Sequence, residues 1–200
     1  MAEFLEMRNI VKRFPGVLAL DHVSLSVRKG EVHALLGENG AGKSTLMKVL
    51  SGAYSKDEGE ILIDGKEVDI RSSADAQKLG ISIIYQELNL TEQLTVAENI
   101  FMGRPIMKNA LKVDWSAMFR EAQKLLDDLG VEINAHSLIR DLGVAHKQMV
   151  EVAKALSLNA RILVMDEPTA PLTNREIDTL FGIIRMLKER GVAIIYISHR

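Results

Sequence analysis

The stretch of sequence that decides the fold reads Gly37-Glu38-Asn39-Gly40-Ala41-Gly42-Lys43-Ser44. It fits the phosphate-binding pattern G-x-x-x-x-G-K-[ST] at every fixed position. Glycines let the backbone curl so that successive N–H groups point at one anion. We expect Lys43 to reach the β- and γ-phosphates of a nucleotide and the Ser44 hydroxyl to ligate Mg²⁺. The alternative interpretation is a chance glycine-rich turn.

The residues on either side of this pattern predict a strand before it and a helix after it. Glu31 to Leu36 is a short apolar run suited to a buried strand. Lys43 to Leu50 is typical of a helix, and Gly52 would close it. The positive N-terminal end of that helix would face the phosphates. Both flanks therefore favour a nucleotide-binding loop.

The composition indicates a globular chain of one domain, with room for an inserted subdomain. The 200 residues are 47% apolar and 26% charged, which is typical of a chain that buries a core. The net charge of −2 gives no reason to expect nucleic acid as a partner. Cysteine is absent, so disulfides and thiolate metal sites are excluded, which fits a reducing compartment. We see no secretion signal and no apolar run long enough to span a bilayer, so we expect a soluble chain whose membrane role depends on a partner.

The remaining pattern predicts an α/β core that is interrupted by a helical insert. Strand patterns cover Glu3 to Phe14, Val23 to Val27, Glu60 to Ile63, Lys66 to Val68, Ile81 to Tyr85, Arg161 to Met165 and Val192 to Ile197. Helical patterns cover Ser72 to Leu79, Asp114 to Leu129 with Asp114 as N-cap, His146 to Leu158 and Asn174 to Arg190. Asp64-Gly65 is a hairpin signal. We therefore expect a strand-rich opening, a core of about residues 1–93 and 159–200, and a helical subdomain of about residues 94–158.

An acidic pair follows the strand pattern that ends at Met165. Asp166 and Glu167 would lie at the carboxyl end of a core strand, where nucleotide folds place metal and water chemistry. Asp166 suits a Mg²⁺ partner, and Glu167 suits a residue that orients or deprotonates the attacking water. The alternative is a solvated acidic strand end, and the phosphate loop favours the functional interpretation.

Three further residues are candidates for nucleotide contact, each with a structural alternative. Gln86 ends a strand pattern, and its amide would touch metal and water or merely cap a turn. His199 follows the last strand, and a neutral imidazole there would contact the γ-phosphate and the water, or be a surface residue. Phe14 lies in a polar stretch before the loop, and would stack on a purine or be buried in the core. Sequence spacing leaves these alternatives open.

The order of these motifs resembles that of the ATP-binding-cassette (ABC) ATPases along nearly the whole chain. The resemblance is closer still to the N-terminal cassette of the subunits that power bacterial monosaccharide importers, of the ribose, galactose, xylose and allose type. It is carried by the stretches Lys12 to Val17, Gly37 to Lys48, Tyr85 to Leu90, Leu94 to Ile100, Gln148 to Leu156, Met165 to Thr169 and Ile197 to Arg200.

The resemblance implies a fold and a role for each matched residue. The fold would be a P-loop nucleoside triphosphatase of ABC type, with a mixed sheet core, an antiparallel β subdomain and an inserted helical subdomain. Phe14 would stack on adenine, Glu167 would be the general base and His199 would sense the γ-phosphate. Ser44 and Gln86 would lie at Mg²⁺, with Asp166 further out. The phosphates of ATP would be bound by Gly37, Glu38, Asn39, Gly40, Ala41, Gly42, Lys43, Ser44 and Thr45.

The resemblance also implies an activity and partners. Two cassettes would sandwich two ATP molecules, and ATP hydrolysis would power sugar import through transmembrane permease subunits that a periplasmic sugar-binding protein supplies. The chain would be peripheral, on the cytoplasmic side of the bacterial inner membrane. Because family members continue past the matching histidine, we expect a C-terminally truncated chain, most of the first of two cassettes. Two alternatives are a soluble ABC ATPase outside transport and a truncated cassette with little or no activity alone.

Two segments depart from the family pattern. The family signature Leu-Ser-Gly-Gly-Gln falls on Leu142-Gly143-Val144-Ala145-His146. The serine hydroxyl that would reach the ATP of the opposite cassette is therefore missing. Val144 and Ala145 place side chains where the backbone should approach phosphate. Pro171, after the acidic pair, removes a backbone N–H.

Overall fold

The computed structural model describes residues 3–169 and 172–198. Contacts divide the chain into two compact units, each described here by itself. The first unit takes residues 1–83, 160–167 and 184–200, and the second takes residues 84–159 and 168–183. No helix within the described residues is long and apolar enough to cross a membrane.

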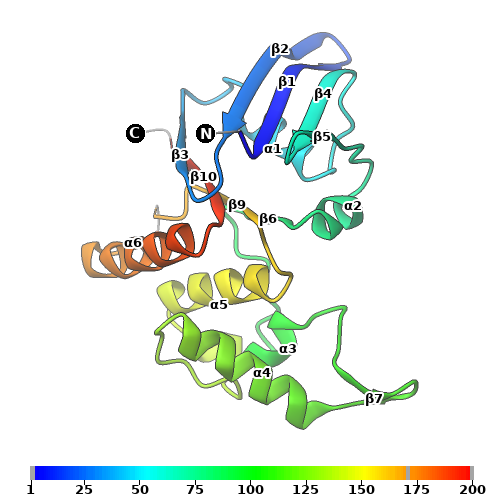
Figure 1. Cartoon of the computed structure of the whole chain (residues 1–200). Helices are drawn as coiled ribbons and strands as arrows, with labels where there is room; N and C mark the ends of the chain where they lie inside the picture. Colours follow the sequence, from blue (N-terminus) through cyan, green and yellow to red (C-terminus); the bar gives the residue numbers. More distant parts are fainter. Residues whose placement is uncertain (1–2, 170–171, 199–200) are drawn as a thin grey trace. The chain divides into compact units, whose positions relative to one another are not determined.

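The first unit contains an antiparallel sheet with the strand order β2-β1-β4-β5 (Figure 1). Its strands are β1 (Leu5–Phe14), β2 (Val17–Val27), β4 (Glu58–Ile63) and β5 (Lys66–Glu67). The predicted hairpin is confirmed: Asp64 and Gly65 have φ of 51° and 71°, as a tight two-residue turn requires. The predicted start of β2 at Val23 is wrong, because irregular pairing with β1 and a positive φ at His22 break the alternation of its first half.

The same unit contains a second sheet with the order β3-β10-β9-β6. These strands are β3 (Val32–Leu36), β6 (Ile81–Ile84), β9 (Ile162–Asp166) and β10 (Ala193–Ser198). The pairing of β10 with β3 and with β9 is parallel. β3 is at the end of this order, and Val32 and Leu36 are 38% and 61% exposed. The expectation of a buried strand here is therefore wrong, since in the described residues β3 is an edge strand.

Two helices of the first unit confirm their predictions. α1 (Lys43–Leu50) buries Leu46, Met47, Val49 and Leu50 in a hydrophobic core that it shares with strands of both sheets. α2 (Ser73–Lys78) begins after Ser72, whose hydroxyl accepts a hydrogen bond from the Asp75 backbone N–H. This core fixes α1 beneath the glycine-rich loop that precedes it.

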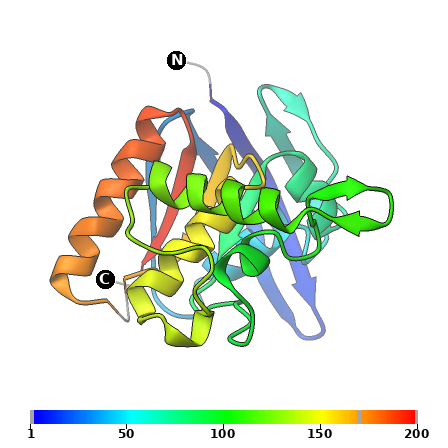
Figure 2. The ribbon, with the colours of Figure 1, turned by 90° about the horizontal axis from the view of Figure 1, so that it is seen from below.

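The second unit is mostly helical, with a small hairpin (Figure 2). Its elements are α3 (Val96–Ile100), β7 (Met107–Asn109), β8 (Lys112–Val113), α4 (Trp115–Asp128), a 3₁₀ turn (Ile139–Asp141) and α5 (Val144–Leu156). Asp114 is confirmed as the N-cap of α4, because its carboxylate accepts from the Ala117 N–H at 2.9 Å. The β7–β8 hairpin was absent from the sequence-based expectation. A last helix, α6 (Asn174–Glu189), starts in this unit and continues into the first at Ile184.

Candidate nucleotide-binding site

The glycine-rich loop joins β3 to α1, as the sequence predicts, and it holds two glycines in left-handed conformations. Gly40 and Gly42 have φ of 85° and 87°. A Cβ atom on Gly42 would lie 2.9 Å from the carbonyl oxygen of Ala19 and 3.0 Å from Leu20 Cδ2. At Gly40 a Cβ atom would meet nothing within 4 Å. Glycine is therefore required at position 42 by both conformation and space, and at position 40 by conformation alone.

Lys43 folds over this loop from the first turn of α1. Its ammonium Nζ donates to the carbonyl oxygens of Gly37 at 2.5 Å and Glu38 at 3.0 Å. The N-cap of α1 is Gly42, which has no side chain to accept from the first N–H groups of the helix. Ser44, the second helical residue, is exposed. A cation, a hydroxyl and an uncapped helix N-terminus thus meet at one loop, and this arrangement suits a polyphosphate.

The acidic pair lies in the same unit, at the carboxyl end of β9. Asp166 is the last residue of β9, and Glu167 follows with a φ of 47°. The N–H of Glu167 donates to the carbonyl oxygen of Ile197 in β10 at 3.1 Å, which fixes the backbone at this strand end.

Asp166 is electrostatically coupled to the phosphate loop. Burial raises the pKa of the Asp166 carboxyl, and the neighbouring charge of Glu167 raises it further. The ammonium groups of Lys43 and Lys48 act in the opposite direction. Lys43 of the loop therefore lies near enough to Asp166 for their charges to interact, although 123 positions separate them in the sequence.

Phe14 has an aromatic neighbour that the sequence analysis did not single out. Its half-buried ring meets the ring of Tyr54 edge-on, with centroids 5.2 Å apart and an interplanar angle of 73°. Lys48 Nζ lies 5.4 Å from the centre of the Tyr54 ring. The available signal was an aromatic residue two positions after Gly52, the glycine that follows α1. Whether Phe14 stacks on a purine stays a prediction.

The remaining predicted site residues lie in the second unit or outside the described residues. Gln86 is exposed and lies two residues beyond β6, in the second unit. His199 and Pro171 lie outside the described residues. The departed signature segment begins α5, with Gly143 as its N-cap and Val144 46% exposed. The roles assigned to these residues stay predictions.

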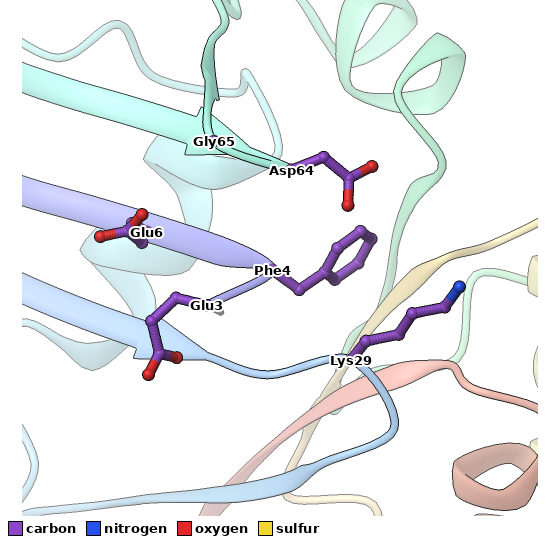
Figure 3. Close-up of a pocket in the computed structure, with 6 residues that line it drawn as sticks. All are labelled: Glu3, Phe4, Glu6, Lys29, Asp64 and Gly65. Carbon is purple, nitrogen blue, oxygen red and sulfur yellow. The ribbon is translucent and has the colours of Figure 1, made fainter. Parts of the chain in front are cut away.

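A separate hollow in the first unit has different chemistry (Figure 3). It is lined by Glu3, Phe4, Glu6, Lys29, Asp64 and Gly65. Asp64 forms an ion pair with Arg161, whose guanidinium lies 4.8 Å from the centre of the Phe4 ring. Because carboxylates outnumber cations along this lining, the hollow does not suit a polyphosphate.

A glycine-rich turn between a strand and a helix, with a lysine drawn over it, is the geometry of the P-loop nucleotide-binding proteins, and this is the class of the chain. Comparison with known proteins narrows the class. Residues 20–170 match the ABC transporter family, and the chain belongs to this family of ATP-binding cassettes.

Two curated relatives are similar over nearly the whole chain. The ribose import ATP-binding protein RbsA 1 of Rubrobacter xylanophilus is 60% identical over 100% of the chain and 40% of its own length. The xylose import ATP-binding protein XylG of Geobacillus kaustophilus is 54% identical over 98% of the chain and 39% of its own length. The chain thus spans about 40% of the length of these relatives.

A solved structure supports the fold as well. The ADP conformation of MJ1267, an ATP-binding cassette of an ABC transporter, has a TM-score of 0.87 and 31% identity. The match covers 100% of the chain and 82% of that structure. The expected cassette fold, with an antiparallel sheet, a second sheet and helical parts, is therefore confirmed.

Proposed function

We propose that the chain binds ATP with Mg²⁺ and hydrolyses it as the energy-coupling part of a bacterial ABC importer for a monosaccharide. The observation that supports this most directly is the geometry of the phosphate loop, in which Lys43 Nζ donates to the carbonyl oxygens of Gly37 and Glu38 beside the N-terminus of α1. The relatives named for ribose and xylose import support a sugar as the cargo. In this proposal the chain is peripheral, on the cytoplasmic side of the inner membrane.

The residues of the first unit have the chemistry that Mg²⁺ requires. The ion prefers oxygen ligands and is usually held by one or two protein oxygens together with substrate phosphates. The exposed Ser44 hydroxyl and the half-buried Asp166 carboxylate supply such oxygens, and Gln86 is a further candidate from the second unit. When bound, the ion neutralises charge on the phosphate oxygens.

The protein's own contribution would be positioning and charge. Lys43 and the N–H groups from Gly37 to Thr45 would hold the phosphates, and Phe14 would hold the adenine. Glu167 would accept the proton of the attacking water, and His199 would contact the γ-phosphate. Two such cassettes would face each other, with transmembrane permease subunits as partners and a periplasmic sugar-binding protein acting through them. Phosphoryl transfer is dominated by orientation and electrostatics, and these groups would supply both.

Turnover of ATP by variants tests the assignment of Glu167. Glu167→Gln keeps the shape of the side chain but removes the base, so ATP binding should persist while phosphate release falls by about 10²-fold or more. Lys43→Ala should weaken nucleotide binding itself, because it removes a charged hydrogen-bond donor to phosphate. The matched control is Glu132→Gln, which removes an exposed carboxylate of the second unit. Undiminished phosphate release by Glu167→Gln would exclude the role given to Glu167.

The transport part of the proposal needs a separate measurement. Affinity purification of the protein from membranes should recover an integral membrane protein with it. Recovery of a cytosolic assembly without any membrane protein would favour an ABC ATPase outside transport.

A further inference from the structure

The β7–β8 hairpin has no part in the proposed nucleotide chemistry. Within the second unit it extends away from α3 and α4 (Figures 1 and 2). Leu111 at its turn is 96% exposed, Met107 is 46% exposed, and Trp115 at the start of α4 is 51% exposed. We call the side chains of Met107, Lys108, Leu111, Lys112 and Trp115 the hairpin surface. Large apolar groups in water at a projecting tip indicate a contact surface.

The charge of the hairpin surface is entirely positive. Lys108 and Lys112 are exposed on either side of the turn, and neither ammonium forms an ion pair within the described part of the chain. Residues 99–113 contain no Asp or Glu, although the chain as a whole has a net charge of −2. The next carboxylate, Asp114, accepts the N–H of Ala117 at the start of α4. The hairpin is therefore a local cation with an apolar tip.

We propose that the hairpin surface docks directly on an anionic lipid bilayer. Leu111 and Met107 would enter the headgroup region, and the two lysines would lie at the lipid phosphates. Lysine side chains place their alkyl stems along apolar surroundings while the ammonium stays hydrated. Tryptophan is enriched at the membrane–water interface, where its ring lies at the level of the headgroups, and Trp115 would lie at this interface. This contact goes beyond the proposed function, in which transmembrane partners alone attach the cassette.

The main competing occupant is an acidic segment of a protein, which would also match the lysines. A specific protein interface usually takes about 20–30 residues from each partner, whereas the hairpin surface has five side chains. A fluid bilayer needs no matching hollow for a projecting tip, and it gains about 1 kcal/mol for each lysine brought to an anionic surface. Shape and size therefore favour lipid.

The single tryptophan of the 200 residues reports on this contact directly, because it belongs to the hairpin surface. Vesicles of equal parts phosphatidylglycerol and phosphatidylcholine should shift Trp115 emission to shorter wavelength. The protein should also float with these vesicles in a density gradient. Vesicles of phosphatidylcholine alone should do neither. Lys108→Gln and Lys112→Gln should each weaken binding to the anionic vesicles about fivefold, which corresponds to about 1 kcal/mol. Leu111→Ser should reduce the emission shift.

Matched controls separate this contact from folding and from ATP chemistry. Lys66→Gln removes an exposed lysine beside the turn of the β4–β5 hairpin and should bind vesicles as the wild type does. Lys43→Ala should also bind vesicles normally, while the hairpin variants should hydrolyse ATP normally in detergent. Equal binding to neutral and anionic vesicles, or wild-type binding by the Lys108→Gln/Lys112→Gln double variant, would overturn the proposal. A photocrosslinker at position 111 that labels a protein rather than lipid in cell membranes would overturn it as well.

Discussion

Glu167 has a left-handed backbone, which costs a residue other than glycine about 1–2 kcal/mol. Its N–H bond to Ile197 extends the pairing of β9 with β10 and holds it there. Strain of this kind persists where the surrounding structure over-determines it, and it concentrates at functional sites. The observed φ at Glu167 therefore favours a functional carboxylate at this strand end over a merely solvated one.

The two left-handed glycines of the loop give a matched pair of variants. Gly42→Ala should lower the free energy of unfolding by about 2 kcal/mol or more, since it combines left-handed strain with a Cβ contact to the Ala19 carbonyl. Gly40→Ala carries the strain without the contact, and should cost about 1 kcal/mol. Urea denaturation of both variants measures the difference. Equal losses of unfolding free energy in the two variants would mean that β2 shifts enough to accommodate the new methyl group at position 42.

At the scale of residues, the sequence predicted which side chains belong to the site better than it predicted which side chains lie close together. The spacing of Gly37, Gly42, Lys43 and Ser44 is enough to predict a phosphate loop, because the pattern is local. The interaction of Lys43 with Asp166 depends on the strand order β3-β10-β9, which no local pattern contains. Tyr54 was missed for the same reason, since its partner Phe14 is far from it in sequence.

At the scale of elements, the turn between β2 and β3 is stabilised by one carboxylate. Glu31 accepts from both the N–H and the Nε of Arg28, each at 2.9 Å. These bonds, with a further one from His33, lower the pKa of Glu31 from 4.5 to about 2. Because the folded pKa lies below the unfolded one, the stabilisation is complete above pH 4.5 and is lost as the pH falls from 4.5 toward 2.

Glu31→Gln should therefore lower the free energy of unfolding at pH 7 by about 1 kcal/mol, after allowance for solvent screening of this surface pair. The gap between the variant and the wild type should narrow steadily as the pH falls below 4.5. Urea denaturation between pH 7 and pH 3 measures it, with Glu67→Gln as the control at an exposed carboxylate of β5. A gap independent of pH would show that Glu31 acts through packing rather than charge.

The segment before α3 depends on a buried amide. Asn99 is fully buried; its Oδ1 accepts from the Thr91 N–H at 2.7 Å and its Nδ2 donates to the Thr91 carbonyl oxygen at 3.1 Å. Asn99→Ala leaves the Thr91 N–H without its acceptor, although the Thr91 carbonyl oxygen keeps the Leu94 N–H at 3.2 Å, and should lower the free energy of unfolding by about 1–3 kcal/mol. Thr95→Ala, which removes only the N-cap hydroxyl of α3, should cost about 1 kcal/mol in the same denaturation experiment. An equal effect of the two would mean that water replaces the amide of Asn99.

Elements with local signals were predicted well, and those set by tertiary context were not. α4 follows its Asp114 cap, and the β4–β5 turn follows Asp64-Gly65. The β7–β8 hairpin has strands too short and too exposed to show any alternation. α5 begins at Val144, two residues before the predicted His146. The start was missed because the N-cap, Gly143, has no side chain that would mark it in the sequence.

At the scale of the whole molecule, nucleotide should stabilise the fold by mass action. At a concentration of 100 times its Kd, a ligand adds about 2.7 kcal/mol to the free energy of unfolding. For a chain of this size, that corresponds to a rise in Tm of about 5–10 °C. Thermal unfolding with ATP and Mg²⁺ measures the rise, and Lys43→Ala should abolish most of it.

Removal of the metal gives the matching control for this rise. Chelation with EDTA should reduce the rise, because phosphate charge is then left to the protein's own cations. The same rise with Lys43→Ala as with the wild type would place the nucleotide somewhere other than the loop.

The two hydrogen bonds that Lys43 donates to its own loop have a consequence for the selectivity of the loop among anions. The ammonium already holds two carbonyl oxygens, so an incoming anion gains only the difference between its attraction and theirs. A singly charged anion such as chloride offers the ammonium one charge, whereas a triphosphate offers several charges at once. The carbonyl contacts of Lys43 therefore disfavour the binding of small, abundant anions more than the binding of a triphosphate, and they keep the loop in one conformation.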